Sequence, residues 1–183
     1  MTLTDDLLEQ VAANAAQARP VDVCIGAFWT AVTVELGGQA RTGISSTLHG
    51  GDDDHHHGGG PPVHAAGRLH EQSVIALTQL ARSNSVLEAS VGVAAINALL
   101  EVDVEDCVNV NAADVIAERG AGKKVAIVGH FPFIPRIWEV AEEMWVLELD
   151  PREGDIHARR APDLIPQADV VALTGTSLLN QTF

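Results

Sequence analysis

The sequence predicts an α+β domain followed by an incomplete, Rossmann-like α/β domain with a parallel sheet. Three apolar segments at 123–129, 145–149 and 168–174 have the character of buried parallel strands, and helical or turn-forming stretches separate them. The first half instead combines a β-branched run, a glycine turn and amphipathic helices. We expect the domains to span 1–84 and 85–183, with the second truncated at its C-terminus.

The N-terminal elements follow from apolar spacing and turn residues. Residues 4–18 have the spacing of an amphipathic helix with Thr4 as its N-cap, and Pro20 ends the pattern. Residues 21–36 are rich in β-branched and aromatic residues, and Gly37-Gly38 is a turn signal before a return strand at 41–48. The predicted structure is an antiparallel hairpin, with room for a bulge near Gly26.

Two helices are predicted next, over 71–82 and 86–100. Ser85 and Glu88 have the spacing of a capping box, and the second helix is apolar on most sides, as buried helices are. Within it, Asn97 is either a satisfied core amide or a residue pointing into a site. A short helix is expected at 111–119, ended by Gly120.

The carboxyl ends of the three predicted parallel strands carry the candidate ligand contacts, because ligands of such sheets bind there. Asp150 follows Gly129 by 21 residues, about the spacing of the acid that grips a ribose. The turn after Gly129 lacks the glycine fingerprint, and Phe131 with two prolines would crowd a pyrophosphate. Ordinary NAD binding is therefore disfavoured, while a nucleotide or S-adenosylmethionine-like ligand stays as an alternative for an enzyme or sensor.

The composition limits the classes of molecule that the protein could bind. The formal net charge is −14, which opposes binding to nucleic acid or anionic membranes and attracts cations. Cys24 and Cys107 are the only cysteines, and both lie in apolar stretches. They predict a cytoplasmic protein with buried free thiols. No complete catalytic signature is present, so whether the protein is an enzyme stays open.

A segment rich in histidine and aspartate separates the predicted hairpin from the next helix. Imidazole and carboxylate together suit a divalent transition metal such as Zn, Ni, Co or Cu. A solvated polar loop with incidental affinity is the alternative, since the spacing matches no closed zinc site. The candidate metal ligands are His49, Asp52, Asp54, His55, His57 and His64.

Four longer stretches, at 87–100, 129–136, 148–155 and 168–182, resemble the heavy-metal-chelation family of uncharacterised prokaryotic proteins. The resemblance implies an enolase N-terminal-like first domain, a Rossmann-like second domain and a ligand cleft between them. It also implies a role in binding a metal ion or a metal-bearing small molecule. The second domain of the family normally continues past the Thr-Gly-Thr segment at 174–176.

The candidate cleft residues come from the strand ends and from the start of the apolar helix. His130 is either a ligand or general base, or a histidine hydrogen-bonded to a neighbouring loop. Asn180 either contacts a ligand or caps a helix, and Glu88 caps its helix unless it reaches the cleft. An open sheet edge also permits self-association into a homo-oligomer. The predicted set is Gly129, His130, Phe131, Asp150, Thr174, Gly175, Thr176, Asn180 and Glu88.

Overall fold

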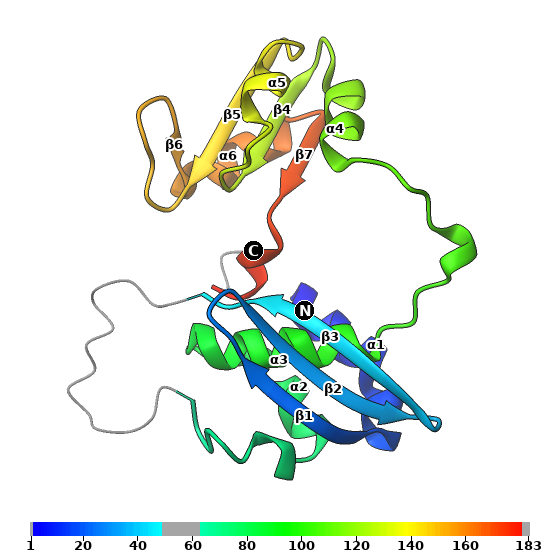
Figure 1. Cartoon of the computed structure of the whole chain (residues 1–183). Helices are drawn as coiled ribbons and strands as arrows, with labels where there is room; N and C mark the ends of the chain where they lie inside the picture. Colours follow the sequence, from blue (N-terminus) through cyan, green and yellow to red (C-terminus); the bar gives the residue numbers. More distant parts are fainter. Residues whose placement is uncertain (1, 49–62, 181–183) are drawn as a thin grey trace, which may run out of the picture. The chain divides into compact units, whose positions relative to one another are not determined.

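The structure, a computed structural model, describes residues 2–48 and 63–180, which form two compact units (Figure 1). The first unit contains the described residues up to Val102 together with those from Gly175 onward, and the second is Asp103–Thr174. This division differs from the predicted boundary at 84/85. The reason is that helix α3 (Val86–Leu99) packs against the sheet of the first unit instead of opening the second.

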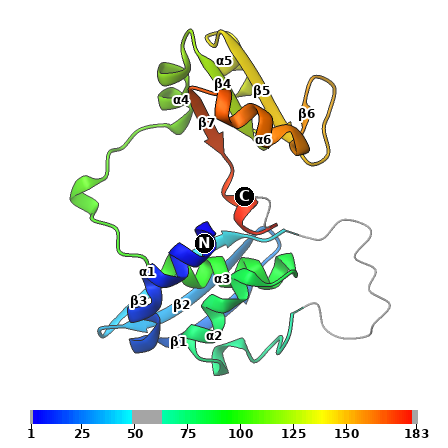
Figure 2. The same cartoon turned by 180° about the vertical axis from the view of Figure 1, so that it is seen from behind.

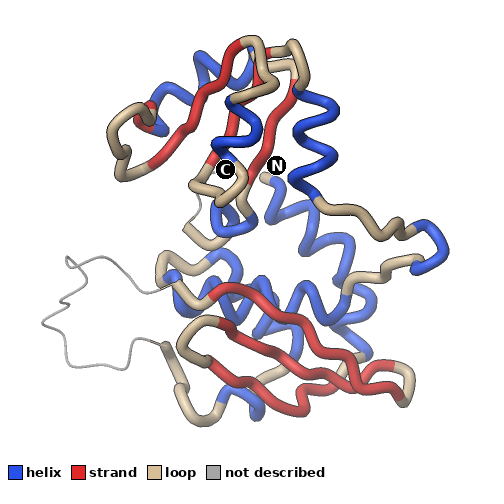
Figure 3. The backbone as a smooth tube through the Cα atoms, turned by 45° about the horizontal axis from the view of Figure 1, so that its top comes forward, coloured by secondary structure: helices blue, strands red, loops and turns tan. Residues whose placement is uncertain are grey.

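The first unit is built on a three-stranded antiparallel sheet of β1 (Arg19–Ile25), β2 (Trp29–Leu36) and β3 (Gln39–Ser46) (Figure 3). The run predicted as one strand at 21–36 is two strands, because the chain turns where the Gly26 N–H donates to the Trp29 carbonyl at 2.9 Å. The second turn, at Gly37-Gly38, is where it was expected.

Helices cover one face of this sheet (Figure 2): α1 (Leu3–Gln17), α2 (Val74–Gln79) and α3. Thr2, not Thr4, caps α1. The Thr2 hydroxyl accepts from the Asp5 N–H while the Asp5 carboxylate accepts from the Thr2 N–H, so two backbone donors are satisfied at once. The helix expected at 71–82 is α2 flanked by 3-10 turns at Leu69–Glu71 and Leu80–Arg82.

Helix α3 is the centre of the first core and is buried on most sides, as predicted. Two glycines set how closely its neighbours approach. A Cβ on Gly43 of β3 would lie 2.1 Å from the Ala94 carbonyl oxygen, and one on Gly92 would lie 1.9 Å from the Ala81 nitrogen. Asn97 is exposed, and its Nδ2 donates to the Ile44 carbonyl at 2.9 Å, so this amide ties α3 to β3.

The second unit contains a four-stranded parallel sheet in the order β6-β5-β4-β7. The strands are β4 (Lys124–Val128), β5 (Glu143–Glu148), β6 (Ile156–His157) and β7 (Val170–Leu173). The three predicted parallel strands are β4, β5 and β7, which confirms the α/β class. The two-residue β6 was not predicted, because an element that short leaves no periodic signal.

Three helices pack in the second unit: α4 (Ala112–Gly120), α5 (Ile134–Trp138) and α6 (Ala161–Leu164). Helix α5 has only five residues. Gly120 is the last residue of α4, and the residue with a positive φ after this helix is Gly122 (65°). The separate core of this unit comprises Ala117, Val125, Ile127, Ile137, Met144, Val146 and Ala172.

The two cysteines do not lie in either core. Cys24 lies in β1 and Cys107 follows a short 3-10 turn, and both are free and exposed. The prediction of buried thiols was wrong. Cys24 is exposed between the half-buried Val23 and Ile25 of β1, and Cys107 lies among exposed residues such as Val104 and Val108. In the described ranges, none of the helices has the length and apolar character needed to cross a bilayer.

Candidate functional site

The strand ends of the second unit bring one histidine and two carboxylates together. His130 follows β4, Glu148 ends β5, and Asp155 lies just before β6. The His130 Nδ1 is 3.8 Å from Glu148 Oε1 and 3.5 Å from Asp155 Oδ2. We call these three residues the His130 cluster. It lies at the edge of the sheet where ligands of doubly wound folds bind.

The loop between β5 and β6 fixes Asp155. Its carboxylate accepts from the Arg152 N–H at 2.9 Å, and the Asp155 N–H donates to the Arg152 carbonyl at 3.0 Å. Only 7% of its side chain is exposed, whereas 33% of the His130 side chain is exposed. The cluster therefore combines a held, buried carboxylate with an imidazole that remains accessible from outside.

The glycine predicted at the end of β4 has a structural reason to be there. Gly129 has φ = 101°, and a Cβ on it would lie 2.8 Å from Thr174 Cγ2. Its N–H donates to the Leu147 carbonyl, and the Thr174 N–H donates to the Val128 carbonyl. Gly129 and Thr174 thus lie side by side at neighbouring strand ends.

Phe131 and Asp150 differ in what they offer a ligand. Phe131 is partly buried, stacks on Phe133 with ring centroids 4.9 Å apart, and packs against the core of the second unit. It supports the turn after His130. Asp150 is exposed just beyond β5. A ligand at this edge would reach the carboxylate of Asp150 more readily than the ring of Phe131.

Glu88 serves the first unit. Its carboxylate accepts from the Ser83 hydroxyl at 2.5 Å and from the His64 N–H at 2.8 Å, while the Ser85 hydroxyl caps the helix by accepting from the Glu88 N–H. The expected spacing of a capping box is present, but the glutamate anchors a loop instead of closing the box. Gly175, Thr176 and Asn180 also belong to the first unit, where the Asn180 N–H donates to the Thr176 carbonyl.

Most of the predicted metal loop lies outside the described residues. Of the six candidate ligands, only His64 is described, and its side chain is exposed. The other five lie outside the described residues: His49, Asp52, Asp54, His55 and His57. Within 2–48 and 63–180, no three His, Cys, Asp or Glu side chains are spaced to hold a metal ion. The His130 cluster therefore offers pairs of donors and not a closed cage.

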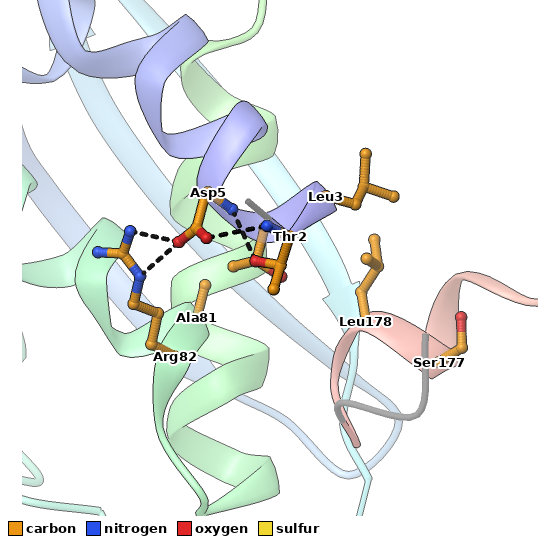
Figure 4. A pocket seen from close by; sticks show the side chains of 8 residues that line it. Thr2, Leu3, Asp5, Ala81, Arg82, Ser177 and Leu178 are labelled. Atoms are coloured by element: carbon orange, nitrogen blue, oxygen red, sulfur yellow. Dashed lines mark hydrogen bonds and ion pairs between the residues drawn. The ribbon is translucent and has the colours of Figure 1, made fainter.

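A pocket of about 300 Å³ lies in the first unit, at the start of α1 (Figure 4). Figure 4 shows the Asp5 carboxylate between Thr2 and the Arg82 guanidinium, with an Asp5 Oδ1 to Arg82 Nη2 distance of 2.6 Å. No residue of the predicted cleft set lines it. The lining residues are Thr2, Leu3, Thr4, Asp5, Ala81, Arg82, Ser177 and Leu178.

Two family models match the chain, and both carry the description "Putative heavy-metal chelation". The DUF4213 model matches residues 8–100, which is half of the chain, and the DUF364 model matches 111–183. The chain belongs to this heavy-metal-chelation family. The resemblance seen in the sequence is thereby confirmed, and the two matched ranges fall on the first and second halves of the chain.

One curated relative matches part of the sequence, and two solved structures share the fold. An uncharacterised protein of Methanocaldococcus jannaschii is 31% identical over 109 residues, and the match covers 56% of this chain and 42% of the relative. Two crystal structures of DUF364 proteins with unknown function are each 21% identical. The Pyrococcus horikoshii structure has a TM-score of 0.78 and the Desulfitobacterium hafniense structure 0.69. The two matches cover 99% and 98% of this chain, and 71% and 72% of the respective solved chains.

Sequence reasoning missed Asp155 as a site residue. It stands 25 positions after His130, in a polar loop with no periodic pattern, and only the short β6 brings it back beside the β4 end. The available signal was its place at the end of the stretch 148–155 that resembles the family. Position at a predicted strand end found His130 and Asp150 but could not find a residue in the following loop.

Proposed function

We propose that this protein binds a divalent transition metal, carried by a small molecule or as the ion, with the His130 cluster as a contact point. The observation that carries the proposal is the meeting of an accessible imidazole with two carboxylates at the carboxyl ends of the parallel strands. Family membership supports the metal, since both matched models describe heavy-metal chelation.

The chemistry of the cluster fits such a ligand. Imidazole and carboxylate are the donors that Zn, Ni, Co and Cu accept, and a carboxylate beside an imidazole also orients the ring. Because no described trio of donors forms a closed cage, the metal needs further ligands. A small molecule that already chelates the ion would bring them, and the histidines and aspartates at 49–64 are the other source.

Equilibrium dialysis followed by elemental analysis tests the proposal. Zn, Ni, Co and Cu would be offered both as chlorides and as equimolar citrate complexes at neutral pH. We expect retention by the unaltered protein and a loss of affinity of about 10- to 100-fold in His130→Gln and in Asp155→Asn. Retention should also fall below about pH 6, because protonated imidazole cannot ligate a metal.

Two further variants test which of the candidate residues contact the metal. His70→Gln removes an exposed histidine of the first unit and should bind like the unaltered protein. A variant with His55→Gln and His57→Gln tests the segment at 49–64. Retention that depends on those two residues and not on His130 would move the site to that segment. No retention above background in either form of the metal would contradict the function itself.

The nucleotide or S-adenosylmethionine-like alternative has weaker support. Gly129 and Asp150 motivate this alternative because they follow β4 and β5. However, α5 is only five residues long, has no side-chain cap and carries Pro135 at its start. A helix start of this kind offers few N–H donors to a phosphate. The same protein can be screened by thermal shift, where ligand at about 100 times its Kd stabilises by about 2.7 kcal/mol.

A further inference from the structure

The loop between β5 and β6 and the turn after β6 bring hydrogen-bond donors to the same strand ends as the His130 cluster. Arg152 lies in that loop before Asp155, and His157 and Arg159 follow at the end of β6. We infer that the ligand of the cluster is a metal complex of an anionic chelator, and that Arg152 binds a carboxylate of the chelator that does not ligate the metal. This inference rests on the proposed metal-binding function and names the chemical class of the ligand.

The main chain of Arg152 lies directly beside the cluster. Its N–H donates to Asp155 Oδ2 at 2.9 Å, and the same oxygen is 3.5 Å from the His130 Nδ1. The Asp155 N–H closes the turn by donating to the Arg152 carbonyl, and Gly154 within this turn has φ = 92°. Since the main chain of Arg152 contacts this carboxylate, its long side chain is within reach of a ligand that the carboxylate binds.

The guanidinium of Arg152 is available to such a ligand. The side chain is exposed, and within 2–48 and 63–180 it forms no ion pair or hydrogen bond. It does so in a chain where Asp and Glu outnumber Lys and Arg by 25 to 11. Arg160 of the same unit is paired instead, with its Nε 3.0 Å from Asp163 Oδ2. The planar fork of an unpaired guanidinium fits a carboxylate, which accepts parallel N–H bonds from it.

His157 supplies a further donor at these strand ends. It is the register partner of Glu148, so the two side chains lie on one face of the sheet. The His157 Nδ1 accepts from the Arg159 N–H at 3.2 Å, which leaves the ring proton of the neutral imidazole on Nε2. A ring in this tautomer donates a hydrogen bond from Nε2 and has no lone pair there for a metal. His157 therefore serves an acceptor on the ligand and not the metal itself.

These two kinds of group describe a ligand with two ends. The His130 imidazole, Glu148 and Asp155 offer electron pairs, which a metal ion accepts. Arg152 and the His157 Nε2 offer N–H donors, which need an anionic or otherwise accepting group. A free metal ion satisfies the first kind only, whereas a metal complex of an anionic chelator satisfies both. The chelator also fills metal positions that the described donors leave open, since no described trio forms a closed cage.

Equilibrium dialysis of the whole chain against two nickel complexes at neutral pH tests this inference. Nickel–citrate is anionic and has a spare carboxylate, nickel–diethylenetriamine is cationic, and both leave metal positions open to the protein. The formal charge of −14 by itself favours the cationic complex, so a preference for the anionic one has to come from local donors. We expect the citrate complex to bind at least about tenfold more tightly, with nickel and citrate retained together.

Three variants assign the preference to a residue. Arg152→Gln should weaken binding of nickel–citrate about tenfold and leave binding of nickel–diethylenetriamine unchanged, because only citrate offers a carboxylate to the guanidinium. Arg152→Lys keeps the charge without the planar fork and should weaken citrate binding less. Arg160→Gln is the matched control, because it removes the same charge from an arginine that already pairs with Asp163. It should leave both affinities unchanged, and circular dichroism should show that all three variants fold.

The outcomes separate this inference from the proposed function on which it rests. Retention of nickel with equal or tighter binding of the cationic complex would overturn the inference and leave metal binding in place. So would nickel–citrate binding that Arg152→Gln leaves unchanged, or that Arg152→Gln and Arg160→Gln weaken alike through loss of charge. No retention of nickel from either complex would contradict the proposed function, and the inference would be overturned with it.

Discussion

Asp5 joins the first turn of α1 to the 3-10 turn that precedes α3. Its carboxylate accepts from the Thr2 N–H at 2.9 Å and pairs with the Arg82 guanidinium, which also donates to the Gln79 side chain. The Thr2 backbone contact, and then Arg82, hold the pKa of Asp5 well below its ordinary range. One residue thus caps a helix and fastens it to a second element.

The lowered pKa of Asp5 predicts an acid-dependent stability. A carboxyl group whose pKa is depressed on folding stabilises the protein above its ordinary pKa, about 3.9, and loses that contribution as pH falls. We expect Asp5→Asn to lower the melting temperature at neutral pH and to flatten its fall below about pH 4. Asp6→Asn, on the same turn and exposed, should leave the profile unchanged. Parallel profiles for Asp5→Asn and the unaltered protein would contradict the assignment.

The residues of the candidate site were only partly predictable. The position of His130 after an apolar strand was readable, because side chains at strand ends meet ligands. The carboxylates near the His130 Nδ1 could not be predicted, since it is a two-residue strand that returns Asp155 to the side of His130. Glu88 was expected to cap its helix, but its carboxylate accepts from Ser83 and His64, and these bonds depend on loop conformations without a sequence signature.

At the level of elements, close contact between α3 and the sheet determines the first unit. Gly43 lets β3 touch the backbone of α3, and the β3 residues on either side, Thr42 and Ile44, are exposed. Periodicity predicted α3 as a buried helix, but it could not say which strand the helix covers. The same limit explains why residues 21–36 were predicted as one strand: the turn between Gly26 and Trp29 contains no proline or glycine pair.

Gly43→Ala should show the cost of that contact. The added Cβ would lie 2.1 Å from the Ala94 carbonyl oxygen and 2.2 Å from the Ala98 nitrogen, both backbone atoms that cannot turn away. We expect the free energy of unfolding, measured in urea, to fall by about 1–3 kcal/mol, as in other overpacked cores. Gly175→Ala, where the new Cβ meets nothing within 4 Å, is the control. Equal stability of the two variants would contradict this packing.

At the level of the whole molecule, the buried apolar residues of 2–48 and 63–180 form two hydrophobic clusters that share no residue. In these described ranges, sixteen buried residues form the first cluster and seven form the second. The smaller cluster belongs to the unit with the parallel sheet. Fewer buried apolar contacts leave less free energy to offset chain entropy, so the second unit should be the less stable one.

Unfolding should therefore proceed in two transitions. In urea followed by circular dichroism, Met144→Ala should lower the midpoint of the earlier transition, while Leu77→Ala should lower the later one. Each substitution removes a buried side chain from one core and should cost about 2–5 kcal/mol. A single cooperative transition, shifted alike by both substitutions, would show that the units unfold together.

The sequence by itself determined the class of each half, the three main parallel strands, the family and the position of His130 at a strand end, because periodicity and strand-end chemistry are local properties of the chain. Tertiary structure alone decided that α3 belongs to the first unit, that Asp155 lies 3.5 Å from His130 and that β7 pairs with β4. These three depend on contacts between residues distant in the sequence, and no local pattern of side chains encodes which segments meet.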